Sequence, residues 1–468
     1  MKTKWIVITL CMVALVTVAI SIRLTVPAVA SAPADQTGPY KVGFVANTYY
    51  DSTRSDFAGG SRPIQTFIWY PADPNNNGDP MPSAVYPLIS LVEPISYPDA
   101  SSADFEAYGI DPAYQAVAAS KDGPFPLVVL SPGAGESSAY FIHIGTRLAS
   151  HGFVVAILTN YDEKIKITGA TTFEPKYYPN MDALSVGRYT NRTRDVQYLM
   201  TRLVADSQQS GNLLSGTIRP DQIAVAGHSV GGGAALALAG GDDQACDMPF
   251  VDLNKIPPEA CVPILPDPRI KAIVIIDGSS QDLRFDEMAR IKIPSMGIEQ
   301  EWNALESGNP PAGFYYARQH AAIQGHPNYR VDVAYATHIS FLNHCALAQV
   351  VHDKGIGDDA ALAGYLQQNC KPEPVSQEEL GNLTTQYMIA FLKTVLVGET
   401  GYREMLTPGY ALKNEPFIEF FETEQGSPNS PDEDGYFSYF KHQPDADQPG
   451  NERAKALKDP GWSGLVDP

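Results

Sequence analysis

The chain has 468 residues, and its 53 Asp and Glu outnumber its 33 Lys and Arg, which gives a formal net charge of −20. This length can hold two or three domains, or one large core with insertions. The acidic balance argues against nucleic acid or an anionic membrane as a partner, and indicates an acidic surface that need not report on the substrate.

The first 30 residues have the pattern of a secretory signal peptide. Lys2 and Lys4 precede an apolar run from Trp5 to Ile20, and Ala28-Val29-Ala30 matches a cleavage site. The apolar run is long, so an uncleaved membrane anchor is the alternative. No later stretch is apolar enough to cross a bilayer. We therefore predict a secreted or periplasmic protein, or one that an uncleaved leader tethers to the membrane.

Apolar runs typical of buried strands alternate with helical patterns through the middle of the chain. This alternation predicts a mainly parallel sheet with helices on both faces. The expected strands are 65–70, 125–130, 153–159, 223–226, 271–276, 291–297 and 331–336, and the expected helices include 140–150, 192–204 and 377–395.

Two segments do not follow this alternation. Residues 72–122 are rich in Pro, Asn, Ser and Gly and are expected to form a loop-rich insertion. Residues 401–468 show little periodicity and are expected to form an irregular C-terminal extension. The catalytic domain is then 31–400.

The most informative motif is Gly227-His228-Ser229-Val230-Gly231, which separates an apolar strand from a helix-compatible run. A serine on such a sharp turn brings the flanking backbone segments close together, so glycine fits where a Cβ would clash. A chance match is the alternative. The strand-before and helix-after context favours Ser229 as the nucleophile of an α/β-hydrolase fold.

A serine nucleophile needs a base and an acid, which follow it in the chain in this fold. His338 follows the strand 331–336 and is the expected base, with His344 and His352 as alternates. Asp277 directly follows the strand 271–276 and is the expected acid. Many α/β hydrolases carry the acid after the next strand, where Glu299 and Glu301 stand.

Backbone N–H groups that stabilise an oxyanion are expected in two places. One is Val230, directly after the serine. The other is Ala134, within the glycine-rich segment 131–136 that follows the strand 125–130. An ordinary glycine turn is the alternative for that segment.

Four cysteines follow the leader, an even number in an export context. We expect the pairs Cys246–Cys261 and Cys345–Cys370, because each brackets a loop-rich stretch. The two other connectivities remain open. The spacings do not suit zinc, and we predict neither a metal nor an organic cofactor.

At this point the residues resemble the platelet-activating-factor acetylhydrolase family of serine α/β hydrolases. The resemblance covers roughly residues 38–71 and 123–395, and one departure is Pro132, where the family usually carries His. The segments that carry it are 38–43, 67–71, 126–135, 149–156, 192–203 and 223–232.

The resemblance has implications for the site and the substrate. The family places its acid after the strand that follows the nucleophile helix, which supports Asp277 over Glu301. Its base lies in a short segment matching Thr337-His338-Ile339-Ser340-Phe341. It also implies short-acyl phospholipids or related small esters as substrates.

The sequence therefore predicts an exported serine carboxylic-ester hydrolase that works through an acyl-enzyme on a small-molecule or lipid ester. A polyester hydrolase, general carboxylesterase or lipase is the alternative, and a catalytically inactive hydrolase-like binding protein is a weaker one. The sequence carries no prediction of oligomeric state.

Overall fold

The computed structural model describes residues 33–423, apart from 56–59, 89–91, 94–96, 161, 168–170, 176–178, 244, 247–251, 257–260, 279–282, 301–315, 317–318, 356–358 and 371–374. The predicted leader, residues 1–30, and the alternative acid Glu301 therefore lie outside the described residues. So does the predicted extension beyond residue 423.

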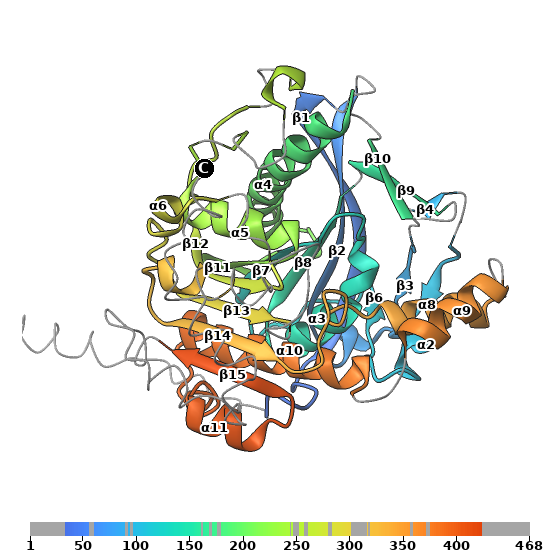
Figure 1. The fold of residues 1–468 in the computed structure, drawn as a ribbon. Helices are drawn as coiled ribbons and strands as arrows, with labels where there is room; N and C mark the ends of the chain where they lie inside the picture. The colour runs from blue at the N-terminus through green and yellow to red at the C-terminus, as the bar shows by residue number, and fades with distance from the viewer. Residues whose placement is uncertain are drawn as a thin grey trace, which may run out of the picture. The chain divides into compact units, whose positions relative to one another are not determined.

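The centre of the fold is a sheet of ten strands in the order β15-β14-β13-β12-β11-β7-β8-β2-β1-β6 (Figure 1). The six strands from β14 to β8 run parallel, while β15 at one side and β2 and β1 at the other pair antiparallel. The strands are β1 Lys41–Ser55, β2 Ser61–Ala72, β6 Tyr114–Gln115, β7 Phe125–Ser131, β8 Val154–Thr159, β11 Ile218–His228, β12 Ile270–Ile276, β13 Ser295–Glu299, β14 Asn328–Val333 and β15 Ile418–Thr423.

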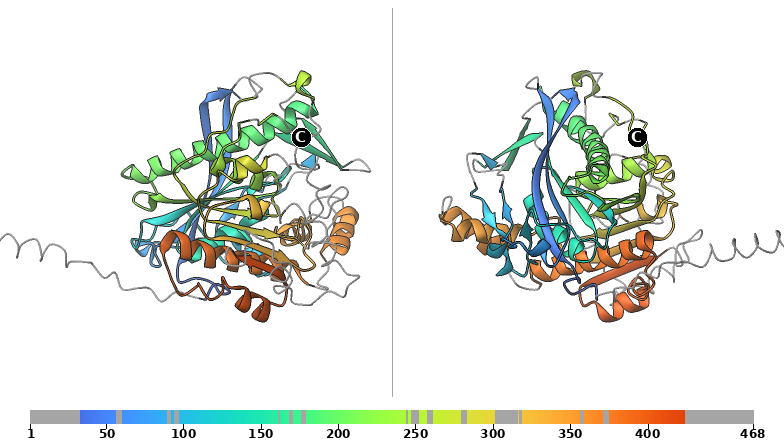
Figure 2. Two further views of the ribbon diagram at one scale, coloured as in Figure 1. Left: turned by 60° about the vertical axis from the view of Figure 1, so that its left-hand side comes forward. Right: turned by 180° about the vertical axis from the view of Figure 1, so that it is seen from behind.

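Helices cover both faces of this sheet (Figures 1 and 2). α3 (Ile142–Ser150) and α10 (Gln377–Leu392) pack on one face, and α4 (Met181–Gln208), α5 (Val230–Gly240) and α6 (Phe285–Met288) lie on the other. The other α-helices in the described residues are α2 Ser102–Glu106, α8 His344–Asp353, α9 Asp359–Asn369 and α11 Pro408–Asn414, and a π-helical turn, Lys393–Val397, continues α10.

Side chains alternate along the central strands between two hydrophobic cores. In β7, Leu127 and Val129 pack in the core beneath α4 and α5, whereas Val128 and Leu130 pack in the core beneath α3 and α10. Because both faces are buried, these strands read as continuous apolar runs. The predicted mainly parallel sheet with helices on both faces is confirmed.

One strand begins later than the sequence pattern predicts. The apolar run from Ile291 suggests a strand over 291–297, but β13 starts at Ser295. Pro294 has no N–H to give to a neighbouring strand, while its carbonyl oxygen accepts from the Ile273 N–H at 3.0 Å. The ladder therefore begins directly after this proline.

The prediction of an irregular extension after residue 400 is wrong for the part that the structure describes. Thr407 caps α11, with Pro408 in its first turn. β15 then pairs antiparallel with β14, so that Val331 lies opposite Phe421. The run of aromatic and β-branched residues from Ile418 favours a strand, and β15 is the edge strand at this side of the sheet.

The segment 72–122 contains short elements but belongs to the main core. Tyr86 and Phe105 are fully buried, and the Trp69 indole Nε1 donates to the Tyr86 hydroxyl at 3.4 Å. β6 extends the large sheet by pairing with β1. The segment also contains a 3-10 turn, Asn76–Gly78, and a small two-stranded sheet of β3 Val85–Tyr86 and β5 Ala100–Ser101. A three-stranded sheet combines its β4 Val92–Glu93 with β9 Glu163–Ile167 and β10 Thr171–Pro175.

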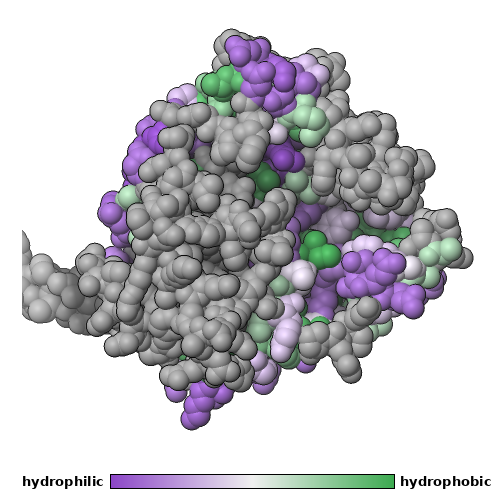
Figure 3. Space-filling model, in the orientation of Figure 1, coloured by the Kyte–Doolittle hydropathy of each residue, from purple (hydrophilic) through white to green (hydrophobic). Residues whose placement is uncertain are grey.

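One face of the described surface can be compared with the hydropathy of the sequence. Hydrophilic side chains cover much of the described surface in the view of Figure 3, and hydrophobic ones form small separate areas. Among the residues that the structure describes, no helix combines the length and hydropathy of a membrane span.

Candidate active site

Ser229 stands between β11 and α5 in a strained backbone conformation. Its φ of 54° and ψ of −126° are unusual for a residue with a side chain. A Cβ on Gly227 would lie 2.0 Å from the Gly231 carbonyl oxygen, and one on Gly231 would lie 2.0 Å from the Ser131 carbonyl oxygen. The turn thus has the close backbone approach expected of a nucleophile elbow, and only glycine fits at these two positions.

Asp277 lies beside the serine because β11 and β12 are neighbours in the sheet. His228 is in register with Ile276, the residue before Asp277, and the Ser229 N–H donates to the Ile276 carbonyl oxygen at 3.2 Å. Asp277 is 1% exposed and has a positive φ of 42°. Both residues therefore stand at the carboxyl edge of the parallel sheet, where α/β proteins bind ligands.

The base candidate reaches this edge from the loop after β14. A turn from Thr337 to Ser340 is closed by the Ser340 N–H on the Thr337 carbonyl oxygen at 2.9 Å. His338 within it is hydrogen-bonded through Nδ1 to Asp277 Oδ2. Its side chain remains 39% exposed, whereas that of Asp277 is buried. A buried carboxylate that orients an accessible imidazole is the arrangement of a general base.

Two further groups hold the aspartate and were missed by the sequence analysis. The Gln300 N–H donates to Asp277 Oδ1 at 3.0 Å, and the Tyr316 hydroxyl donates to the same oxygen at 2.5 Å. The side-chain amide of Gln300 also donates to the Tyr316 hydroxyl at 3.1 Å. No motif marks these residues, because their roles depend on where the segment after β13 lies.

The predicted alternatives that the structure describes lie on other elements. Glu299 is the last residue of β13, is 1% exposed, and is in register with Asp332. His344 and His352 belong to α8, where the His344 Nε2 lies 3.4 Å from Cys345 Sγ and the His352 Nδ1 lies 3.3 Å from Asp353 Oδ1. Of the histidines in the described residues, His338 is the one shown hydrogen-bonded to Asp277.

The two predicted oxyanion donors belong to segments that touch. Ser131 and Pro132 carry the carbonyl oxygens nearest the Cβ position of Gly231. The buried Arg192 guanidinium donates to the Pro132 carbonyl oxygen at 2.5 Å, which anchors this loop to α4. Ala134 and Val230 are both half-buried, and each lies within two residues of the contact between Pro132 and Gly231.

Two clusters within the described residues have the composition of metal ligands. In the first, one atom each of His228, Asp277 and His338 lie within 4.8 Å of one another. The His338 Nδ1 is hydrogen-bonded to Asp277, and both His228 nitrogens have partners 2.8–3.0 Å away. These bonds would have to break before an ion could be bound, so the cluster fits proton transfer better.

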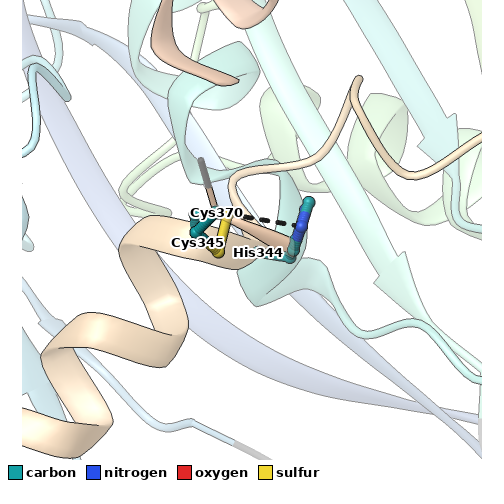
Figure 4. A group of neighbouring side chains, drawn as sticks. All are labelled: His344, Cys345 and Cys370. Carbon is teal, nitrogen blue, oxygen red and sulfur yellow. Dashed lines mark hydrogen bonds between the residues drawn. A yellow bond between two sulfur atoms is a disulfide. The ribbon is translucent and has the colours of Figure 1, made fainter. Parts of the chain in front are cut away.

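The second cluster is His344 beside Cys345 and Cys370 (Figure 4). Its two sulfur atoms are bonded to each other, with Cα atoms 5.6 Å apart, so they are not thiolate ligands. Cys246 and Cys261 form the other pair, with Cα atoms 5.3 Å apart. Both pairs fit the connectivity expected from the sequence.

Residues 107–181 match the model of a family described as platelet-activating factor acetylhydrolase, isoform II. The chain is similar to that family over these residues. The match begins inside the segment 72–122, whose motifs do not resemble the family, and it ends well before the elbow. The matched residues include β7, the loop with Ala134, α3 and β8.

A solved structure shows the same fold. The ferulic acid esterase from Streptomyces cinnamoneus superimposes with a TM-score of 0.50 and 21% sequence identity, over 79% of this chain and 93% of that chain. The predicted α/β-hydrolase fold is thereby confirmed. No curated protein gives a significant match.

Proposed function

We propose that this α/β hydrolase is a serine carboxylic-ester hydrolase with Ser229, His338 and Asp277 as its catalytic residues. The observation that carries the proposal is the Asp277–His338 hydrogen bond at the sheet edge to which the Ser229 elbow is tied. A strained serine, an oriented imidazole and a buried carboxylate are the parts that acyl transfer needs. The similarity to an acetylhydrolase family supports the same reaction class.

The proposed mechanism has two steps. His338 Nε2 takes the proton of the Ser229 hydroxyl as its oxygen attacks the ester carbonyl, and the same imidazolium then protonates the leaving alcohol. Water, deprotonated by His338, attacks the acyl-enzyme, and the serine recovers its proton as the acid leaves. Asp277 stabilises the imidazolium in both steps, and the Ala134 and Val230 N–H groups stabilise the oxyanion.

For the substrate we propose a short-acyl phospholipid or a related small ester. The family similarity supports this choice. A polyester or general carboxylesterase substrate is the second candidate. Because the structural neighbour is a ferulic acid esterase, a ferulic acid ester should be tested beside these substrates. We further propose export, which the two disulfides support because such bonds persist in oxidising compartments.

The test is hydrolysis of p-nitrophenyl acetate and p-nitrophenyl octanoate by the purified protein, with Ser229→Ala as control. We expect turnover of the acetate, and its loss in the alanine variant. A fluorophosphonate should add one mass equivalent to the wild type and none to Ser229→Ala. Turnover that survives in the alanine variant would exclude the proposed nucleophile, and no turnover or labelling of the wild type would support a binding protein.

A further inference from the structure

A second histidine–carboxylate pair lies behind the proposed catalytic residues. His228, the residue before the nucleophile, is fully buried, and its Nδ1 lies 2.9 and 3.0 Å from the two carboxylate oxygens of Glu136. Glu136 is 9% exposed and comes from the loop after β7. A histidine at this variable position of the elbow needs no partner for the turn to form, so the pair requires its own explanation.

The other nitrogen of His228 connects the pair to the base. Its Nε2 lies 2.8 Å from the backbone carbonyl oxygen of His338, and the two imidazole rings pack with centroids 4.7 Å apart. A carbonyl oxygen only accepts hydrogen bonds, so this Nε2 carries a proton. His228 thus donates to the backbone of the residue whose own ring is held by Asp277.

Glu136 also controls the loop that carries Ala134. Its carboxylate accepts from the Gly133 N–H at 2.5 Å, and its own N–H donates to the Gly133 carbonyl oxygen at 3.4 Å. A Cβ on Gly133 would lie 2.8 Å from the carboxylate, so glycine is needed for this close approach. The side chain therefore closes the turn 133–136 around the proposed oxyanion donor.

The hydrogen-bond partners of His228 and the pKa of Glu136 favour an ion pair between these two residues. Burial by itself would raise the pKa of Glu136, but the charge and hydrogen bond of His228 and the Gly133 N–H outweigh it and lower that pKa. The ionised Glu136 carboxylate accepts a hydrogen bond from Nδ1, and the His338 carbonyl oxygen accepts one from Nε2, so both ring nitrogens of His228 carry a proton and the pair is an imidazolium with a carboxylate. The titratable groups around it are Glu136, Asp277 and His338.

We propose that Glu136 and His228 are positioning residues that act as one unit, holding the oxyanion loop and the backbone of the base in a fixed relation. This inference rests on the proposed function. Glu136 fixes the turn with Ala134, His228 fixes the His338 carbonyl, and the ion pair between them joins the two loops. Neither residue touches the substrate in this proposal.

The test compares Glu136→Gln, His228→Phe and the double variant with the wild type. The phenylalanine keeps a ring against His338 but gives neither hydrogen bond. We expect kcat for p-nitrophenyl acetate to fall roughly a hundredfold in each single variant with KM little changed, because misplacement by an ångström or the loss of one oxyanion donor has that effect. Labelling of Ser229 by the fluorophosphonate should slow by a similar factor.

Two matched controls separate positioning from general destabilisation. His151 is 1% exposed, and its Nε2 lies 2.8 Å from the Gln36 carbonyl oxygen, so His151→Phe removes a similar buried bond elsewhere. Asp111→Asn removes a buried carboxylate whose oxygen lies 2.6 Å from the Arg147 guanidinium. Both controls should lower the unfolding temperature while kcat stays near that of the wild type.

The double variant decides whether the residues act as a unit. If they do, it is no slower than the slower single variant, whereas two independent contributions would multiply. Multiplied losses, or wild-type kcat in a folded Glu136→Gln, would overturn the proposal. If Ser229→Ala also keeps its activity, the proposed function itself fails, whereas an inactive Ser229→Ala beside an unaffected Glu136→Gln refutes only the positioning unit.

A measurement on the wild type covers the case in which the variants do not fold. The ¹⁵N and ¹H signals of the His228 ring should show protons on both nitrogens, as the two acceptors around it require. A ring with one proton, or with protons that exchange as fast as those of an exposed histidine, contradicts the ion pair and the proposal.

Discussion

The backbone N–H of Ser229 donates to the carbonyl oxygen of Ile276 at 3.2 Å, so the elbow is hydrogen-bonded to the residue that precedes Asp277. The bond extends the pairing of β11 with β12 by one residue past the end of β11. The backbones that carry the nucleophile and the acid therefore belong to neighbouring strands of one sheet, whose backbones lie about 4.8 Å apart in a typical sheet. His338 is the residue that must be brought in from elsewhere.

Asp277→Asn should lower kcat by about 10⁴-fold while the protein stays folded. An amide cannot stabilise the imidazolium, and it favours the wrong tautomer of His338. The measurement is hydrolysis of p-nitrophenyl acetate, with circular dichroism to check folding. Glu301→Gln is the control and should keep its activity. A loss in the glutamine variant beside an active Asp277→Asn would show that the acid is Glu301.

Tyr316→Phe should lower kcat/KM at least tenfold. It removes the hydroxyl that donates to Asp277 Oδ1, and a hydrogen bond to a charged group contributes about 1.5–3 kcal/mol. Tyr189→Phe is a matched control, because the hydroxyl of Tyr189 on α4 donates to the buried Asp242 at 2.9 Å. If both variants lose activity equally, the effect is one of stability and Tyr316 has no special role at Asp277.

Removal of the Cys246–Cys261 disulfide should lower the free energy of unfolding by about 3 kcal/mol in the chain-entropy model, because the bond closes a loop of 15 residues. Urea unfolding of a variant with serine at both positions measures this change. Treatment of the wild type with a reductant is the control and should give at least the same loss. Equal stability of oxidised and reduced wild type would mean that the bonds do not constrain the unfolded chain.

Acidification from pH 6.5 to pH 4 should destabilise the protein through His143. Burial lowers the pKa of this imidazole to about 4, against roughly 6.5 in the unfolded chain. The unfolded state binds more protons between these values, so the free energy of unfolding is unaffected above pH 6.5 and falls by up to about 3 kcal/mol towards pH 4.

His143→Gln should make that pH dependence shallower. Part of the pH dependence should remain in this variant, because burial also lowers the pKa of His344 to about 4. Urea unfolding of both proteins at pH 7, 5.5 and 4.5 measures the slope. Parallel curves for the two proteins would show that His143 does not titrate with unfolding.

The strands and the elbow were predictable because their signals are local. The apolar run of β12 predicts a buried strand, and the glycines around Ser229 predict a sharp turn, each from a few neighbouring residues. β15 was missed because its partner, β14, is some 90 residues earlier in the chain, and an edge strand without a nearby turn partner gives a weak signal. Glu136 was missed for a similar reason, since its carboxylate meets His228 92 residues away.

By itself the sequence determined the chemistry available: a serine on a tight turn, an aspartate after a buried strand, a histidine in a short loop, and cysteines in pairs. The tertiary structure decided which of these meet. It placed His338 rather than His344 or His352 against Asp277, and it joined Glu136 to His228. The physical reason is that strand order and loop packing set distances between groups far apart in the chain, whereas local patterns set only backbone conformation and burial.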